Sequence, residues 1–99
     1  MTQTRLAKQQ VAEEMIRVIQ LCKDARNAPN AYGYLPDIID SLRLMLNDLR
    51  APSMDSQENR RRARSAVGRI ALDGVEFCYS ELGISIFNVI NDYADSQDD

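Results

Sequence analysis

Four arginines within five positions are the residues of this chain whose type and spacing could do chemistry. The run reads Arg60-Arg61-Arg62-Ala63-Arg64. The forked guanidinium group of arginine binds phosphates and carboxylates well. Four cations near the start of a helix oppose the helix dipole, so helix stability does not explain them. The run therefore predicts a surface for an anion or an acidic partner, nucleic acid included.

The alternative interpretation is that the arginines are a solvated surface. Glu58 and Arg62 have the spacing of an i,i+4 ion pair, and a charge run is usually solvated. No aromatic residue stands among the arginines to stack on bases. The formal net charge of the chain is -3, whereas nucleic-acid binders are usually basic. We favour the solvated surface, and nucleic acid is the less favoured partner.

No other group of residues indicates catalysis, a metal or a cofactor. The chain has no histidine, which excludes Ser-His-Asp and Cys-His relays and the Glu-x-x-His motif of di-iron bundles. Cys22 and Cys78 alone cannot make a structural zinc site within one chain. The four glycines are scattered and form no phosphate-binding loop. We expect no enzyme activity, no cofactor and no metal.

Length and composition suggest one domain over residues 1–99. The hydrophobic fraction of 44% is ordinary for a globular protein. No run of apolar residues is long enough for a membrane span, and no apolar signal segment follows the polar N-terminus. We therefore expect a cytoplasmic protein. Cys22 and Cys78 are expected to be buried free thiols, and residues 94–99 a frayed acidic tail.

The spacing of apolar residues predicts an all-α protein. In each long segment they recur every three or four positions, which places them on one face of a helix. The expected helices cover about 4–27, 36–50, 56–82 and 85–93. We predict an antiparallel up-down helical bundle of three main helices plus a short C-terminal helix, without a sheet.

Several residues have the character of helix caps. Thr4 is the expected N-cap of the first helix. Asp55 and Glu58 have the spacing of a capping box at the start of the third. Gly83 follows Leu82 as a C-terminal glycine would, and Ser85 is then expected to cap the last helix.

The helix expected over 56–82 contains an interruption at Asp73-Gly74. One interpretation is a break or kink there, because glycine inside a helix costs about 1 kcal/mol. The other is the close approach of a neighbouring helix at the small residues Ala71, Gly74 and Cys78. The apolar stripe continues through Gly74, so we favour the second. Such a helix would be longer than its neighbour, and its arginines are expected to overhang.

Apolar residues beyond the core stripes suggest a partner surface. Leu44, Ile84 and Phe87 are the candidates. We therefore predict a non-enzymatic interaction module, a small adaptor, chaperone-like or regulatory bundle that self-associates. One alternative is a nucleic-acid-linked regulator that uses Arg60–Arg64. Another is an antagonist whose acidic residues in 73–99, seven acids without a base, mimic nucleic acid.

Overall fold

The computed structural model describes residues 8–29, 31–51 and 56–95, and all regular structure in these ranges is helical. The helices are α1 (Lys8–Ala25), α2 (Leu35–Arg50), α3 (Ser56–Leu72), α4 (Val75–Cys78) and α5 (Glu81–Asp95). The prediction of an all-α protein is confirmed. The expected caps Thr4 and Asp55 lie outside the described residues.

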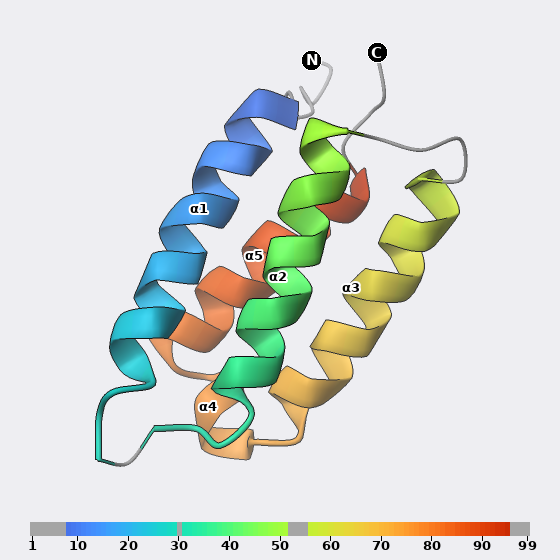
Figure 1. Cartoon of the computed structure of the whole chain (residues 1–99). Helices are drawn as coiled ribbons and strands as arrows, with labels where there is room; N and C mark the ends of the chain where they lie inside the picture. The colour runs from blue at the N-terminus through green and yellow to red at the C-terminus, as the bar shows by residue number, and fades with distance from the viewer. Residues whose placement is uncertain (1–7, 30, 52–55, 96–99) are drawn as a thin grey trace, which may run out of the picture.

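The four long helices close a ring, with α4 at one end (Figure 1). The packed pairs are α1 with α2, α2 with α3, α3 with α5, and α5 with α1. In Figure 1, α1 descends, α2 rises, α3 descends and α5 rises, so neighbours in the ring run in opposite directions.

The core is built mainly from α1, α2 and α5. Seven residues of α2 and five of α1 are buried, on the stripes that their spacing predicts: Leu35, Ile38, Ile39, Leu42, Met45, Leu46 and Leu49 from α2, and Val11, Met15, Val18, Ile19 and Cys22 from α1. Burial of a large aliphatic side chain contributes about 1.5–3 kcal/mol. Among the side chains of α3 whose burial is described, residues 58–72, the buried apolar ones are Val67 and Ala71.

The prediction of one helix over 56–82 is wrong. Helix α3 ends at Leu72, and Gly74 has an extended backbone with φ -100° and ψ 102°. A Cβ atom at Gly74 would come within 2.5 Å of Cε1 of Tyr32, which real Cβ atoms do not tolerate. The close neighbour at this glycine is therefore an aromatic ring, and the break is the correct interpretation.

Helix α5 begins earlier than predicted, and Gly83 lies in its first turn instead of ending a helix. Ser80, and not Ser85, is the cap, because its hydroxyl accepts a hydrogen bond from the Gly83 N–H (3.1 Å). Its carbonyl accepts one from the Ile84 N–H (2.9 Å). The helix continues to Asp95, so the expected fraying from residue 94 is wrong for its first two residues.

Tyr32 fastens the loop between α1 and α2 to the corner between α3 and α4. Its hydroxyl donates a hydrogen bond to the carbonyl of Ile70 (2.6 Å). Its ring stacks on Phe77, with centroids 4.3 Å apart and planes inclined by 14°. The contact ties the end of α3 and the single turn of α4 to the end of α1.

Both cysteines are free, and their surroundings predict different reactivity. Cys22 is fully buried, and burial raises the pKa of its thiol to about 11. Cys78 is only partly buried on α4. We expect a thiol reagent at mildly alkaline pH to modify one cysteine per native chain quickly, and the second only in denaturant. Equal rates for the two thiols in the native protein would contradict the core position of Cys22.

Glu14 on α1 gives the fold a pH dependence. Burial raises the pKa of its carboxyl, and a hydrogen bond and the negative charge of Asp92 on α5 add to the shift, while Arg17 opposes it. Because the folded-state pKa lies above the unfolded value, the folded protein holds this proton more tightly. The resulting stability is fully present below the unfolded pKa and is lost as the pH rises through the folded pKa.

Glu14→Gln should therefore raise stability at neutral pH, by on the order of 0.5 kcal/mol for a solvent-screened pair of like charges. Thermal unfolding at mildly acidic and neutral pH measures the effect, which should shrink at acidic pH. Glu13→Gln, at an exposed neighbouring position, is the matched control. A gain of the same size in both variants would contradict the role of the pair.

Candidate functional site: the groove between α3 and α5

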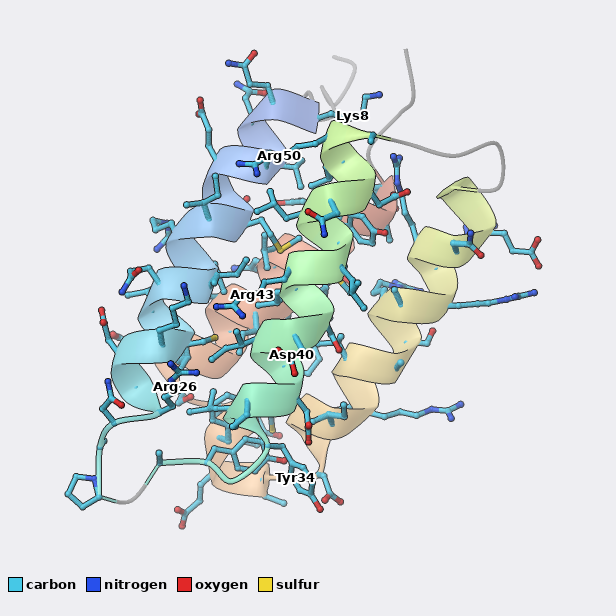
Figure 2. All side chains as sticks on the ribbon, in the orientation of Figure 1. Lys8, Arg26, Tyr34, Asp40, Arg43 and Arg50 are labelled. Atoms are coloured by element: carbon cyan, nitrogen blue, oxygen red, sulfur yellow. The ribbon has the colours of Figure 1, made fainter. Side chains whose placement is uncertain are left out.

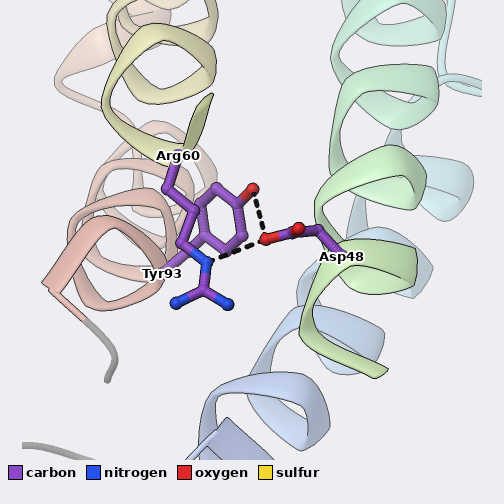
Figure 3. Close-up of polar contacts among 3 residues, drawn as sticks. All are labelled: Asp48, Arg60 and Tyr93. Atoms are coloured by element: carbon purple, nitrogen blue, oxygen red, sulfur yellow. Dashed lines mark hydrogen bonds and ion pairs between the residues drawn. The ribbon is translucent and has the colours of Figure 1, made fainter. Parts of the chain in front are cut away.

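Arg60 belongs to the interior, so the expected overhang of the arginines is wrong for this residue. Its side chain is 0% exposed, and its Nε donates a hydrogen bond to Oδ2 of Asp48 at 2.8 Å. The guanidinium carbon lies 5.6 Å from the centroid of the Tyr93 ring. The Tyr93 hydroxyl donates to the same Asp48 oxygen at 3.1 Å (Figure 3). Ion pairing and hydrogen bonding make the buried charge tolerable.

The same network joins three helices. Asp48 comes from α2, Arg60 from α3 and Tyr93 from α5. Burial raises the pKa of the Tyr93 hydroxyl, and the negative charge of Asp48 raises it further, so this hydroxyl remains protonated as a donor. The network adds polar contacts to the few buried apolar residues of α3.

The other three arginines do not form one surface with Arg60. Arg62 is exposed and pairs with Glu58 at 2.7 Å, as their spacing predicts. Arg61 is exposed. The Nη1 atom of Arg64 donates to Oδ1 of Asn91 on α5 at 3.4 Å. The run therefore divides between the core, the solvent and the boundary with α5.

An open groove of about 320 Å³ lies between α3 and α5. We call it the α3–α5 groove, and its lining residues are Arg64, Ser65, Gly68, Arg69, Leu72, Phe87, Ile90 and Asn91. The lining thus combines an apolar floor with two arginines and contains no acidic residue. Gly68 has no side chain and so leaves the Phe87 ring uncovered at this position. A Cβ atom added there would lie 3.8 Å from the ring, at ordinary contact distance.

Two contacts set the register of the groove walls. Arg64 meets Asn91, and the Gly68 position faces Phe87. Because α3 and α5 run in opposite directions (Figure 1), one further turn places residue 72 level with residue 84. Leu72 is 59% exposed and Ile84 is 50% exposed, so the apolar floor continues onto Ile84.

The groove brings together two residues that the sequence suggested separately, Arg64 of the arginine run and Phe87 of the surplus apolar residues. Ile84 lies beyond the lining residues, about one turn from Phe87 on α5. Phe87 also packs against the core and is only partly buried. Leu44, which is 70% exposed, lies instead at a second groove of about 250 Å³ on the α2 side of α3.

Six of the eight groove-lining residues were not predicted from the sequence as part of a site: Ser65, Gly68, Arg69, Leu72, Ile90 and Asn91. Gly68 and Leu72 follow Arg64 at intervals of four, which is a helix face beside the buried stripe. That spacing is the signal that could have identified them. It was hidden because the stripe was assigned to one long helix through residue 82.

Other kinds of site find no support in the part of the chain that the structure describes. It holds no group of three or more cysteine, aspartate or glutamate side chains able to bind a metal ion. None of its helices combines the length and apolarity needed to cross a membrane.

Chemically, the α3–α5 groove can hold a carboxylate beside an apolar side chain. No protein-family model, curated protein or solved structure matches this chain.

Proposed function

We propose that this chain is a non-enzymatic protein-interaction module that binds a helix of its partner in the α3–α5 groove. In this proposal it is a cytoplasmic up-and-down helical bundle that self-associates and serves as an adaptor, chaperone-like or regulatory protein. The observation that carries the proposal is the exposed apolar floor beside two arginines.

The form of the groove favours a helix as its occupant. Small-molecule pockets enclose most of the surface of their ligand, whereas this groove is open to solvent. An amphipathic helix can place residues one turn apart into such a groove. The positive charge of Arg64 and Arg69, without a lining acid to offset it, favours acidic residues on that helix.

Less supports the two nucleic-acid alternatives. A phosphate-binding surface would need the arginine run to be available, but Arg60 is in the core and Arg62 is paired with Glu58. A nucleic-acid mimic would need its acids on one face. Asp92 interacts with Glu14 of α1, whereas Glu76 lies on α4 at the end of the bundle.

A designed peptide tests the proposed site. The probe is a helical peptide with leucines at intervals of three and four and glutamates between them, and a lysine version serves as the charge control. We expect saturable binding of the acidic peptide only, measured by fluorescence anisotropy. Arg69→Glu should weaken it about tenfold, which corresponds to about 1.4 kcal/mol.

Two further variants separate the groove from general charge. Gly68→Leu fills the floor and should abolish binding without loss of helix content, since leucine is a better helix former than glycine. Arg43→Glu changes the same charge on the exposed face of α2 and should have no effect. No binding of the acidic peptide, or equal losses for Arg43→Glu and Arg69→Glu, would contradict the proposal.

A further inference from the structure

We infer that the occupant of the α3–α5 groove is α2 of a second copy of this chain, which presents Leu44 together with Asp37 and Asp40. The inference rests on the proposed protein-binding role of the groove.

The exposed face of α2 carries an apolar residue that its own fold leaves uncovered. Leu44 is 70% exposed, although the seven residues of the buried stripe of α2 are at most 9% exposed. Asp40 and Asp37 are exposed and precede Leu44 by four and seven positions, so the three share one helix face. In Figure 2, Asp40 lies on the side of α2 that faces the viewer, and Arg43 lies on the side toward α1.

This face complements the groove in both charge and length. The face offers two acids and one leucine, and the groove offers two arginines and an apolar floor. At 1.5 Å per residue, Asp37 to Leu44 spans about 10 Å and Arg64 to Leu72 spans about 12 Å.

The spacing suggests one arrangement, with α2 of the second copy parallel to α3. Leu44 then lies over the floor at Leu72. One turn back along both helices, Asp40 is level with Arg69, and two turns back, Asp37 is level with Arg64. Each acid thus has an arginine at its own level.

The contact joins two different surfaces, so it is heterologous. Leu44 lies on the α2 side of α3, and the groove lies on the α5 side. Each copy can therefore donate α2 to one neighbour and accept α2 from another, and the assembly grows with concentration. The contact is small compared with stable dimer interfaces, so it is expected to be weak.

Sedimentation velocity of the full chain tests the inference first. We expect the mean mass to rise with concentration up to about 1 mM, the range of weak contacts. A mass that stays monomeric throughout would overturn the inference. The designed acidic peptide keeps that failure distinct, because its binding would leave the proposed function of the groove standing.

Mixing two variants then tests the surfaces. Leu44→Asp removes the donor face and leaves the groove, whereas Gly68→Leu fills the groove and leaves the donor face. Each variant alone should remain monomeric, and an equimolar mixture should form a dimer with one copy of each. A monomeric mixture, or self-association of either variant to the wild-type extent, would overturn the inference.

Exchanging the charges at two positions tests whether Asp40 of one copy lies beside Arg69 of the next. Asp40→Arg and Arg69→Asp should each weaken self-association about tenfold, and the double variant in one chain should restore it. Arg43→Glu should leave it unchanged. Failure of the double variant to recover, or a loss in Arg43→Glu equal to those of the two single variants, would overturn the pairing and the inference with it.

Discussion

Arg60→Ala should lower the free energy of unfolding by about 3 kcal/mol, the lower end of the range for breaking a buried ion pair. The substitution removes the buried guanidinium that pairs with the Asp48 carboxylate beside Tyr93. The lower end is appropriate because the side chain of Asp48 is 19% exposed and keeps some access to water. Denaturation by urea, followed by circular dichroism, measures the loss.

Removing all three polar groups should cost much less than removing one. The triple variant Arg60→Met, Asp48→Leu and Tyr93→Phe removes the three polar groups together, and apolar packing replaces the contacts among them. We expect its stability to lie close to that of the wild type. A triple variant less stable than Arg60→Ala would contradict this expectation. It would show that the contacts of the network stabilise the fold by more than the desolvation of its polar groups costs.

Replacing glycine by alanine should lower the stability of the protein at Gly83 and raise it at Gly68. Gly83→Ala should destabilise the protein by about 2 kcal/mol, as overpacking does, because the new Cβ would collide with the carbonyl oxygen of Phe77. That oxygen belongs to the backbone, so α4 and α5 must move apart. Gly68→Ala should stabilise the protein by about 1 kcal/mol, since its Cβ meets the Phe87 ring only at 3.8 Å.

Thermal unfolding of the two variants under one set of conditions checks this pair of predictions. Each variant controls for the other, because alanine replaces glycine within a helix in both. Two shifts of the same sign would contradict the positions assigned to these glycines.

Helices α1 and α2 could be predicted from the sequence because each has one uninterrupted stripe of apolar residues. A loop that contains proline separates the two helices. The stripe of α2 matches the buried residues in full. The chain after Leu72 was harder, because the stripe from Ala63 to Leu82 keeps its spacing across two corners. Spacing along the sequence cannot distinguish one long helix from three shorter ones that face the same core. The contact that decides is between Tyr32 and Gly74, which are 42 positions apart.

The burial of Arg60 could be predicted in part from the sequence. Extended one turn toward the N-terminus, the stripe of Ala63 and Val67 reaches Arg60. Asp48 and Arg60 are also equally distant in sequence from position 54, so antiparallel pairing of the two helices brings them level. The groove was harder to predict from the sequence, because its shape depends on the register of α3 against α5 and on the missing side chain of Gly68.

The ring of Tyr32 on the α3–α4 corner has a consequence for the kinetics of folding. The contact with Phe77 closes a segment of 45 positions, from 32 to 77, and the entropy of such a closure must be lost before the contact contributes. We expect this contact to form after the transition state. Removing the Tyr32 ring should then raise the unfolding rate more than it lowers the folding rate, so the ring mainly lengthens the lifetime of the folded protein.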